Sequence, residues 1–445
     1  MIVVGAGPAG EVAAGRLAEH GKRVVLVERE LVGGECSFYA CMPSKALLRP
    51  AELLREAARV PGAAQALAGP LDVPAVLARR DEVIHDLSDE SQMPWIESRG
   101  IELVRGAARL DGPRRVRIGE DVLSARDAVV LAVGSGALFP PIPGLAEAAA
   151  WSNREITTAK EVPQSLVVLG GGVVGVEMAQ AWASLGSRVS VVEALDRLLA
   201  REEPVAGEQV RQALEEDGVT VRTGSKATAV ERQAQEVTVV LETGERFTAQ
   251  HLLVAIGREP HTEDLGLDSV GLEPGQYVEV DDHLQVKGVD GLYAIGDVNG
   301  RSLLTHSGKY QARIAADHIL GAPARAFGDV PGAPRVTFTD PQVAAVGLTL
   351  EAAREAGLPA TAIDVDVEGN AGGSFYGRGA NGTSRFVVDS EREVLVGVTF
   401  VGPGVGDFLH AASIAVVGEV PLRTIAHAVA AFPTRSEVWL KFVEA

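Results

Sequence analysis

Cysteine is scarce in this sequence: only Cys36 and Cys41 occur among 445 residues. The chain also lacks an N-terminal secretory pattern, a run of basic residues, and any apolar run near the roughly 20 residues that cross a membrane. Two thiols cannot build a disulfide scaffold, so a small disulfide-rich secreted fold is excluded. The formal net charge of -19 argues against nucleic acid or an anionic membrane as a partner. These absences predict a cytoplasmic protein with no membrane span.

Both cysteines lie in one short segment, GGECSFYACMPSK. Two isolated thiols five residues apart favour a redox pair over a structural disulfide, which a reducing compartment does not sustain. A pair of buried, unreactive cysteines is the remaining alternative. Residues five apart on a regular helix point about 140° away from each other, so we expect Cys36 in a loop or distorted turn and Cys41 near a helix start. Lys45, one turn after Cys41, then brings a positive charge that favours thiolate over thiol.

A glycine fingerprint followed by an acidic residue occurs twice. Each copy follows a short apolar strand, and the acid ends the next strand 23 residues after the first glycine. In such motifs the glycines permit a tight turn, the helix N-terminus holds a pyrophosphate, and the acid accepts ribose hydroxyls. One copy could arise by chance, but two with matched spacing predict two dinucleotide sites. The residues are Gly5, Gly7, Gly10 and Glu28 in the first copy and Gly170, Gly172, Gly175 and Glu193 in the second.

The order of motifs resembles the class I pyridine nucleotide-disulfide oxidoreductases, which include dihydrolipoamide dehydrogenase, glutathione reductase and mercuric reductase. GAGPAG is followed by GG-x-C-x4-C-x-PSK, GGGVVGVE, YAIGD and finally FPTRSE, so the likeness covers the whole chain. It implies an α/β fold with two Rossmann-like dinucleotide-binding domains, one for FAD and one for NAD, plus a C-terminal α+β dimerisation domain in a homodimer. The implied boundaries are 1–148 with 258–328 for FAD, 149–257 for the nicotinamide nucleotide, and 329–445 for dimerisation.

The resemblance also implies a path for electrons, from the nicotinamide through FAD to a Cys36–Cys41 disulfide and on to a small-molecule electron acceptor. Cys41 matches the thiol that contacts the flavin, and Cys36 matches the thiol that attacks the substrate. Lys45 matches a lysine beside the flavin. Glu177 matches the carboxylate that pairs with this lysine, although an ordinary solvated helix residue is the alternative.

The choice of cofactor follows from the resemblance and from Glu193. An acid at this position accepts the ribose hydroxyls and repels a 2′-phosphate, so we expect NADH to be preferred over NADPH. Arg197 and Arg201 are close enough in sequence to leave NADPH open. No metal site is predicted. The further flavin-binding residues that the resemblance implies are Gly134 and Asp297, of which Asp297 also suits an ordinary turn after a buried strand.

The chain departs from the family pattern at Phe432. Relatives that exchange dithiols carry His-Pro-Thr-x-x-Glu, where this chain has FPTRSE. Phenylalanine transfers no proton, and loss of general acid–base catalysis typically costs 10²–10⁴-fold in rate. We therefore expect an acceptor such as a quinone or a metal ion instead of a dithiol or disulfide. Glu437 matches the glutamate that orients this histidine in relatives, but Thr434 and Glu437 also spell a capping box at a helix start.

Two other functions stay open from the sequence. One is a dihydrolipoamide dehydrogenase with a different proton-transfer route. The other is a non-catalytic binding protein that keeps FAD for stability, although the intact cysteine pair and Lys45 argue against it. Mercuric ion reduction is disfavoured, because the chain lacks additional cysteines near its C-terminus.

Overall fold

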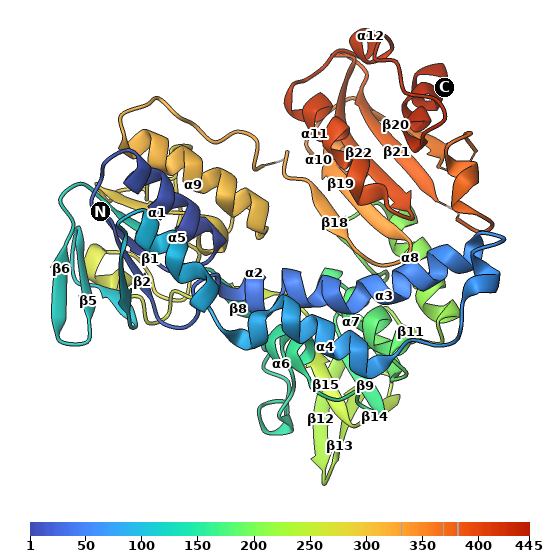
Figure 1. The fold of residues 1–445 in the computed structure, drawn as a ribbon, viewed down its shortest axis with the longest axis horizontal. Coiled ribbons are helices and arrows are strands. Elements are labelled where there is room, and N and C mark those ends of the chain that lie inside the picture. The colour runs from blue at the N-terminus through green and yellow to red at the C-terminus, as the bar shows by residue number, and fades with distance from the viewer. Residues whose placement is uncertain (331, 368, 381) are drawn as a thin grey trace. The chain divides into compact units, whose positions relative to one another are not determined.

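The computed structural model describes residues 1–330, 332–367, 369–380 and 382–445. The chain forms two compact units, the first made of Met1–Pro43, Asp81–Leu138 and Arg258–Val330, the second of Ser44–Arg80, Phe139–Gly257 and Pro331–Ala445. Helices and sheets alternate in both, which confirms the α/β class (Figure 1). Within the described ranges, no helix is both long and apolar enough to cross a membrane.

The first unit is built on a parallel sheet with strand order β17-β7-β1-β2-β3. Strands β1, β7 and β17 are buried along their whole length, as expected for largely apolar strands covered on both faces. Helices α1 and α9 lie side by side in this unit, with Gly308 of α9 packed closely on Ala9 of α1 (Figure 1). The elements are β1 (Ile2–Val4), α1 (Pro8–Glu19), β2 (Val25–Glu28), α2 (Gly34–Phe38), α5 (Met93–Ser98), β3 (Glu102–Arg105), β4 (Ala108–Leu110), β5 (Arg115–Ile118), β6 (Asp121–Ser124), β7 (Val129–Leu131), β8 (Ser135–Ala137), β16 (Arg258–Pro260), β17 (Leu292–Ala294) and α9 (Thr305–Ile319).

The second unit contains a parallel sheet with strand order β11-β10-β9-β15 and an antiparallel C-terminal sheet with order β18-β19-β22-β21-β20. Trp182 is fully buried in the core around the parallel sheet, and Phe386 stacks on Phe442 in the C-terminal core. The elements are α6 (Asn153–Thr158), β9 (Ser165–Leu169), α7 (Val173–Ser184), β10 (Arg188–Val192), α8 (Pro204–Glu216), β11 (Thr220–Arg222), β12 (Ala227–Gln233), β13 (Glu236–Leu241), β14 (Arg246–Ala249), β15 (His251–Val254), β18 (Arg335–Thr337), β19 (Gln342–Gly347), α10 (Leu350–Glu355), β20 (Ala360–Asp366), β21 (Thr383–Asp389), β22 (Val394–Gly402), α11 (Leu409–Val417), α12 (Leu422–Ile425) and α13 (Val438–Glu444).

Two more helices, α3 (Cys41–Arg59) and α4 (Val73–Val83), contain points at which the chain passes from one unit to the other. Cys41 is the first residue of α3, as the spacing of the thiols predicts. Cys36 lies in the five-residue helix α2 instead of a loop, and the residues between α2 and α3 provide the break that a continuous helix would lack.

Candidate functional site

In the first fingerprint, each glycine has a separate role. Gly7 immediately precedes α1, and no side chain caps the helix there. A Cβ on Gly10 would lie 1.9 Å from the carbonyl oxygen of Gly5, so this position tolerates only glycine where helix and strand meet. A Cβ on Gly7 would meet nothing within 4 Å. The start of α1 therefore has open space at Gly7 and no side-chain cap, which suits a pyrophosphate.

The second fingerprint repeats this geometry. A Cβ on Gly175 would lie 1.9 Å from the carbonyl oxygen of Gly170, whereas one on Gly172 would meet nothing within 4 Å. Gly172 precedes α7, whose N-terminus also has no side-chain cap. In both fingerprints, the backbone in front of the helix therefore has a shape that suits a dinucleotide.

The two acids at the ends of the neighbouring strands also match. Glu28 accepts hydrogen bonds from the N–H groups of Ala6 and Glu30, both at 2.7 Å. Glu193 accepts hydrogen bonds from the N–H of Gly171 at 2.5 Å and from the N–H of Leu195 at 2.7 Å. Each carboxylate therefore braces its own glycine turn, in addition to the ribose contact predicted for it.

Asp297 lies in a polar cluster at the end of the first unit's sheet. Its Oδ2 accepts a hydrogen bond from the Ser135 hydroxyl at 2.6 Å and is 3.5 Å from the Arg258 Nε. Arg258 also donates to the Ser135 hydroxyl at 2.7 Å, and the preceding residue, Gly134, turns the chain with φ of +72°. Sequence analysis missed Ser135 and Arg258, although IGREP directly after the second dinucleotide-binding segment was a visible signal.

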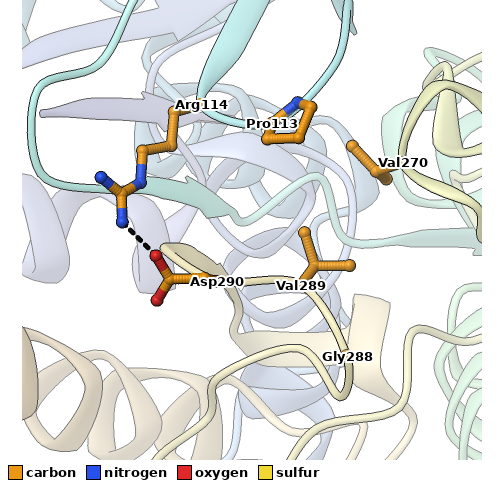
Figure 2. A pocket seen from close by; sticks show the side chains of 6 residues that line it. All are labelled: Pro113, Arg114, Val270, Gly288, Val289 and Asp290. Atoms are coloured by element: carbon orange, nitrogen blue, oxygen red, sulfur yellow. Dashed lines mark hydrogen bonds and ion pairs between the residues drawn. The ribbon is translucent and has the colours of Figure 1, made fainter.

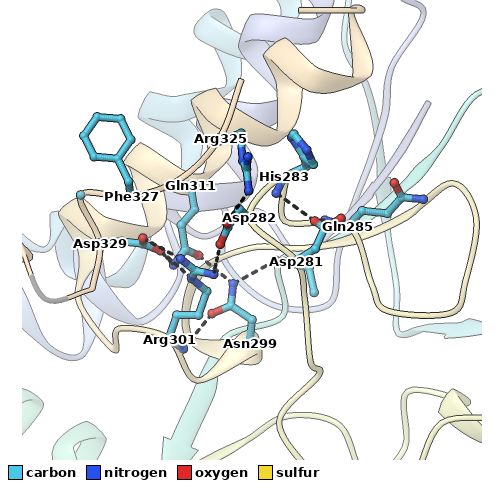
Figure 3. A network of polar contacts seen from close by, with 12 residues as sticks. Asp281, Asp282, His283, Gln285, Asn299, Arg301, Gln311, Arg325, Phe327 and Asp329 are labelled. Atoms are coloured by element: carbon cyan, nitrogen blue, oxygen red, sulfur yellow. Dashed lines mark hydrogen bonds and ion pairs between the residues drawn. The ribbon is translucent and has the colours of Figure 1, made fainter. Parts of the chain in front are cut away.

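A buried polar network fixes the segment that follows Asp297 (Figure 3). The Arg301 guanidinium donates two hydrogen bonds to the Asp329 carboxylate, at 2.9 and 3.0 Å, and the Asp329 side chain is 0% exposed. Gln311 of α9 donates to Asp329 at 2.9 Å and accepts from the Asn299 amide at 2.8 Å. The network therefore ties the turn carrying Asp297 to α9.

The thiol pair lies at the start of α9. The Cys36 and Cys41 side chains are both partly exposed. The Cys41 sulfur is 3.4 Å from the hydroxyl of Thr305, the first residue of α9. The pKa of Cys36 is raised, first by its hydrogen bond with Cys41 and then by burial. Sequence analysis missed Thr305, and the disulfide stays a prediction.

In the second unit, Lys45 and Glu177 form an ion pair. The Lys45 Nζ is 2.8 Å from the Glu177 Oε2, and the other oxygen accepts the N–H of Phe338 at 2.9 Å. Nζ also lies 4.7 Å from the centre of the Phe338 ring, within cation–π range. The Glu177 side chain is only 3% exposed, so it is not an ordinary solvated helix residue.

At the C-terminal segment, Phe432 is 76% exposed. Glu437 accepts the N–H of Gly372 at 3.0 Å, so this acid holds the loop before β21 against the FPTRSE segment. The capping box is wrong: the Thr434 hydroxyl donates to the carbonyl of Ala431 at 2.7 Å and caps no helix. A threonine hydroxyl that bonds backward along the chain is not free to cap the turn ahead.

Two further features bear on ligand chemistry. Across the described ranges, no group of three or more His, Cys, Asp or Glu could hold a metal ion. A hollow in the first unit, crossed by an ion pair between Arg114 and Asp290, contains none of the predicted site residues (Figure 2). It is lined by Pro113, Arg114, Val270, Gly288, Val289 and Asp290.

The chain thus has an α/β fold, two glycine fingerprints of matching geometry and a thiol pair. Residues 1–316 match the pyridine nucleotide-disulphide oxidoreductase family, and residues 333–442 match its dimerisation domain. The chain therefore belongs to this family and is an FAD-dependent oxidoreductase. Members of the family use FAD and NAD(P)H.

The family contains enzymes with different acceptors. The chain is 33% identical to a dihydrolipoyl dehydrogenase of Thermus scotoductus, over 100% of this chain and 96% of the relative. It is 29% identical to a mercuric reductase of Staphylococcus aureus, over 98% of this chain and 80% of the relative. Its fold matches the flavoprotein disulfide reductase RclA of Escherichia coli, solved as a Cu(II) complex, with a TM-score of 0.87, 24% identity, and coverage of 100% of this chain and 98% of that one.

Proposed function

We propose that this protein transfers electrons from NADH, through FAD and a Cys36–Cys41 disulfide, to a small acceptor that needs no proton from an imidazole. A quinone or an oxidising metal ion meets this requirement. The observation that carries the proposal is Phe432, which stands where dithiol-exchanging relatives have a histidine and is 76% exposed. A base at this position would be open to solvent and substrate, but phenylalanine cannot act as one.

The first unit would hold FAD. The N–H groups at the start of α1, beyond Gly7, suit the pyrophosphate, Glu28 suits the ribose, and Asp297 suits the ribityl chain. When bound, FAD accepts hydride from reduced nicotinamide and supplies two electrons at the thiol pair. Ser135 and Arg258 orient the Asp297 carboxylate, so we add both to the residues proposed to support flavin binding.

The nicotinamide side would be served by the second fingerprint and by Lys45. The Glu177 carboxylate holds the Lys45 ammonium at 2.8 Å, so the lysine is oriented before any substrate arrives. We propose that this pair acts beside the flavin, as the family resemblance implies. Glu193 supports a preference for NADH, because its carboxylate would repel a 2′-phosphate.

The protein is proposed to work as a homodimer. Residues 333–442 match a dimerisation domain, and the family resemblance places the segment of Phe432 at the partner's thiol pair. Light scattering at micromolar concentration should give about twice the 46.5 kDa chain mass. A mass near that of one chain would contradict the composite site.

The thiol relay can be tested by counting thiols. Anaerobic NADH should convert a Cys36–Cys41 disulfide into two free thiols, together with a long-wavelength thiolate-to-flavin absorbance band. A Cys36→Ser variant should give no such gain. If NADH bleaches the flavin without releasing any thiol, the disulfide plays no part in the relay, and a protein that NADH does not reduce at all would be the non-catalytic alternative.

The acceptor can be tested by comparison. Phe432→His should raise dihydrolipoamide turnover by about tenfold or more and leave quinone reduction nearly unchanged. Among described residues, the Glu437 Oε1 has no hydrogen-bond partner, so it is available to orient the new imidazole. Phe375→His is a matched control, since Phe375 is another phenylalanine of this domain and is 67% exposed. Ordinary dehydrogenase rates with dihydrolipoamide in the natural protein would favour the dihydrolipoamide dehydrogenase alternative, which full-length likeness to such an enzyme also supports.

A further inference from the structure

One phenylalanine contacts both members of the Lys45–Glu177 ion pair. Phe338 directly follows β18 and belongs to the same unit as α7. Its backbone N–H donates to the Glu177 Oε1 at 2.9 Å, and its ring centre lies 4.7 Å from the Lys45 Nζ. The backbone of this residue therefore holds the carboxylate, while its side chain faces the ammonium.

The ring restricts the direction in which the ammonium points. The Lys45 Nζ donates to the Glu177 Oε2 at 2.8 Å and to the neighbouring Ser44 hydroxyl at 3.3 Å, and the lysine side chain is 35% exposed. Lysine carries a compact charge on a flexible chain, so an ion pair fixes its distance from a carboxylate better than its direction. The negative face of an aromatic ring attracts a cation as well, so Phe338 adds a second fixed point for the ammonium.

The segment that carries Phe338 is itself fixed to α3 and α7. Two residues further on, the N–H of Asp340 donates to the side-chain oxygen of Gln180 in α7 at 2.7 Å. The Asp340 carboxylate, which is 3% exposed, pairs with Arg59 of α3 at 2.6 Å. Residues 338–340 thus contact both helices at each end, which gives the ring a defined place beside the ion pair.

Packing alone does not account for this contact. Phe338 is only partly buried, at the margin of the core around the parallel sheet. A leucine could cover the same margin, but it has no negative ring face for an ammonium. The property that distinguishes phenylalanine at this position is therefore its electrostatic attraction for Lys45.

We propose that Phe338 is a positioning residue that holds the Lys45 ammonium where it acts beside the flavin. This inference rests on the proposed role of the Lys45–Glu177 pair. Phe338 acts through the lysine and contacts no part of the nucleotide. Loss of the ring should therefore weaken the contact and slow the reduction of the flavin, without changing the affinity for NADH.

The contact can be measured without nucleotide by a double-mutant cycle. Phe338→Leu removes the ring and keeps the backbone N–H that Glu177 accepts. In urea unfolding of the FAD-loaded protein, this change should raise the unfolding equilibrium constant about two- to fivefold more in the natural background than in Lys45→Met, which is the range of a cation–π contact at a partly exposed site. Phe247→Leu is the matched control, since Phe247 is also a partly buried phenylalanine of this unit but packs on a different core. It should show no coupling with Lys45.

The electrostatics of the ring can be varied with almost no change in its shape. Phenylalanines that carry one, two or three fluorine atoms, incorporated at position 338, have progressively weaker negative faces. The coupling with Lys45 should decline in that order, and Phe338→Tyr should retain it. A coupling that stays constant along the series would mean that the ring acts only by its shape, which would overturn the proposal.

The functional measurement is the rate at which NADH reduces the bound flavin in anaerobic stopped-flow experiments. Phe338→Leu should lower the limiting rate about two- to fivefold at an unchanged half-saturating NADH concentration, and Phe338→Tyr should keep the natural rate. Absence of coupling with Lys45, or coupling without any effect on the limiting rate, would overturn the proposal. If NADH does not reduce the flavin of the natural protein, the proposed relay itself is wrong, whereas the unfolding cycle still measures the contact.

Discussion

The two fingerprint helices bury an acidic side chain in different ways. Both begin at an uncapped glycine, and both carry a carboxylate in the first turn after the last fingerprint glycine: Glu11 in α1 and Glu177 in α7. Glu177 is held by the Lys45 ammonium at 2.8 Å and by a backbone N–H. Glu11 has no ion pair with any described residue, and burial raises its pKa to about 7.

The difference shows how one scaffold serves two purposes. A buried carboxylate is tolerated either when a cation and hydrogen bonds compensate its charge or when it takes up a proton. The helix of the second fingerprint uses the first solution, which keeps a charged lysine oriented. The helix of the first fingerprint uses the second, which leaves a group that changes its charge near neutral pH.

The largest expected effect comes from the glycines that both helices share. Gly10→Ala and Gly175→Ala each place a Cβ 1.9 Å from a carbonyl oxygen, and should destabilise the protein by about 1–3 kcal/mol or more. Gly7→Ala and Gly172→Ala should fold normally, because the space there is open, and lose dinucleotide affinity. Thermal unfolding and flavin content measure the two effects separately. Equal unfolding temperatures for Gly10→Ala and Gly7→Ala would contradict the assignment of Gly10 to packing and Gly7 to dinucleotide binding.

The ion pair of α7 should matter next. Glu177→Gln leaves the Lys45 ammonium without its carboxylate and should lower the free energy of unfolding by about 1–3 kcal/mol, less than for a fully buried pair because Lys45 is partly exposed. The double variant Lys45→Met/Glu177→Gln should recover part of the loss. Urea unfolding of the natural protein, Glu177→Gln, Lys45→Met and the double variant gives the coupling energy, and strict additivity would mean that the pair contributes no interaction.

The acids that brace the glycine turns give the third prediction. Glu193→Arg should shift kcat/KM toward NADPH by about tenfold, because arginine can bind the 2′-phosphate that glutamate repels. Glu193→Gln is the control, since it removes the charge and retains a side chain that can reach the N–H of Gly171. A natural enzyme that already favours NADPH tenfold would refute the role of Glu193.

The smallest effect should be the pH dependence caused by Glu11. Burial raises the pKa of Glu11 in the folded protein to about 7, above its ordinary value of 4.5, so the folded state binds more protons between these values. The proton on Glu11 therefore stabilises the folded state fully below pH 4.5, and this stabilisation is lost as the pH rises through 7. Glu11→Gln should flatten this fall, which should amount to about 1 kcal/mol because solvent screens this half-buried group, in unfolding experiments across that range. Glu19→Gln, at the exposed end of α1, should keep the slope of the natural protein.

The sequence predicted features that depend on local spacing. The two fingerprints, their acids, and Cys41 at a helix start all follow from short motifs, and the structure places them accordingly. The pairing of Lys45 with Glu177 was available only through resemblance, because 132 residues separate them. Thr305 could not be predicted, since it reaches the thiols from a distant segment that carries no motif for that chemistry. Ser135 and Arg258 were missed, although Ser135 directly follows Gly134 and Arg258 lies in the IGREP segment. The predicted capping box does not form, because the Thr434 hydroxyl donates a hydrogen bond to the nearby carbonyl of Ala431 instead.

The hydrogen bond between Glu437 and Gly372 determines which position of the FPTRSE segment should be changed first. The glutamate fastens one loop to another whether or not a base stands at position 432. A Cβ on Gly372 would lie 2.0 Å from the backbone of Thr434, so the loop contact is close as well as hydrogen-bonded. Residue 432 can thus be exchanged in a single step, toward or away from histidine, while the acid stays in place. Engineering a new acceptor specificity should accordingly begin at position 432 and leave position 437 untouched.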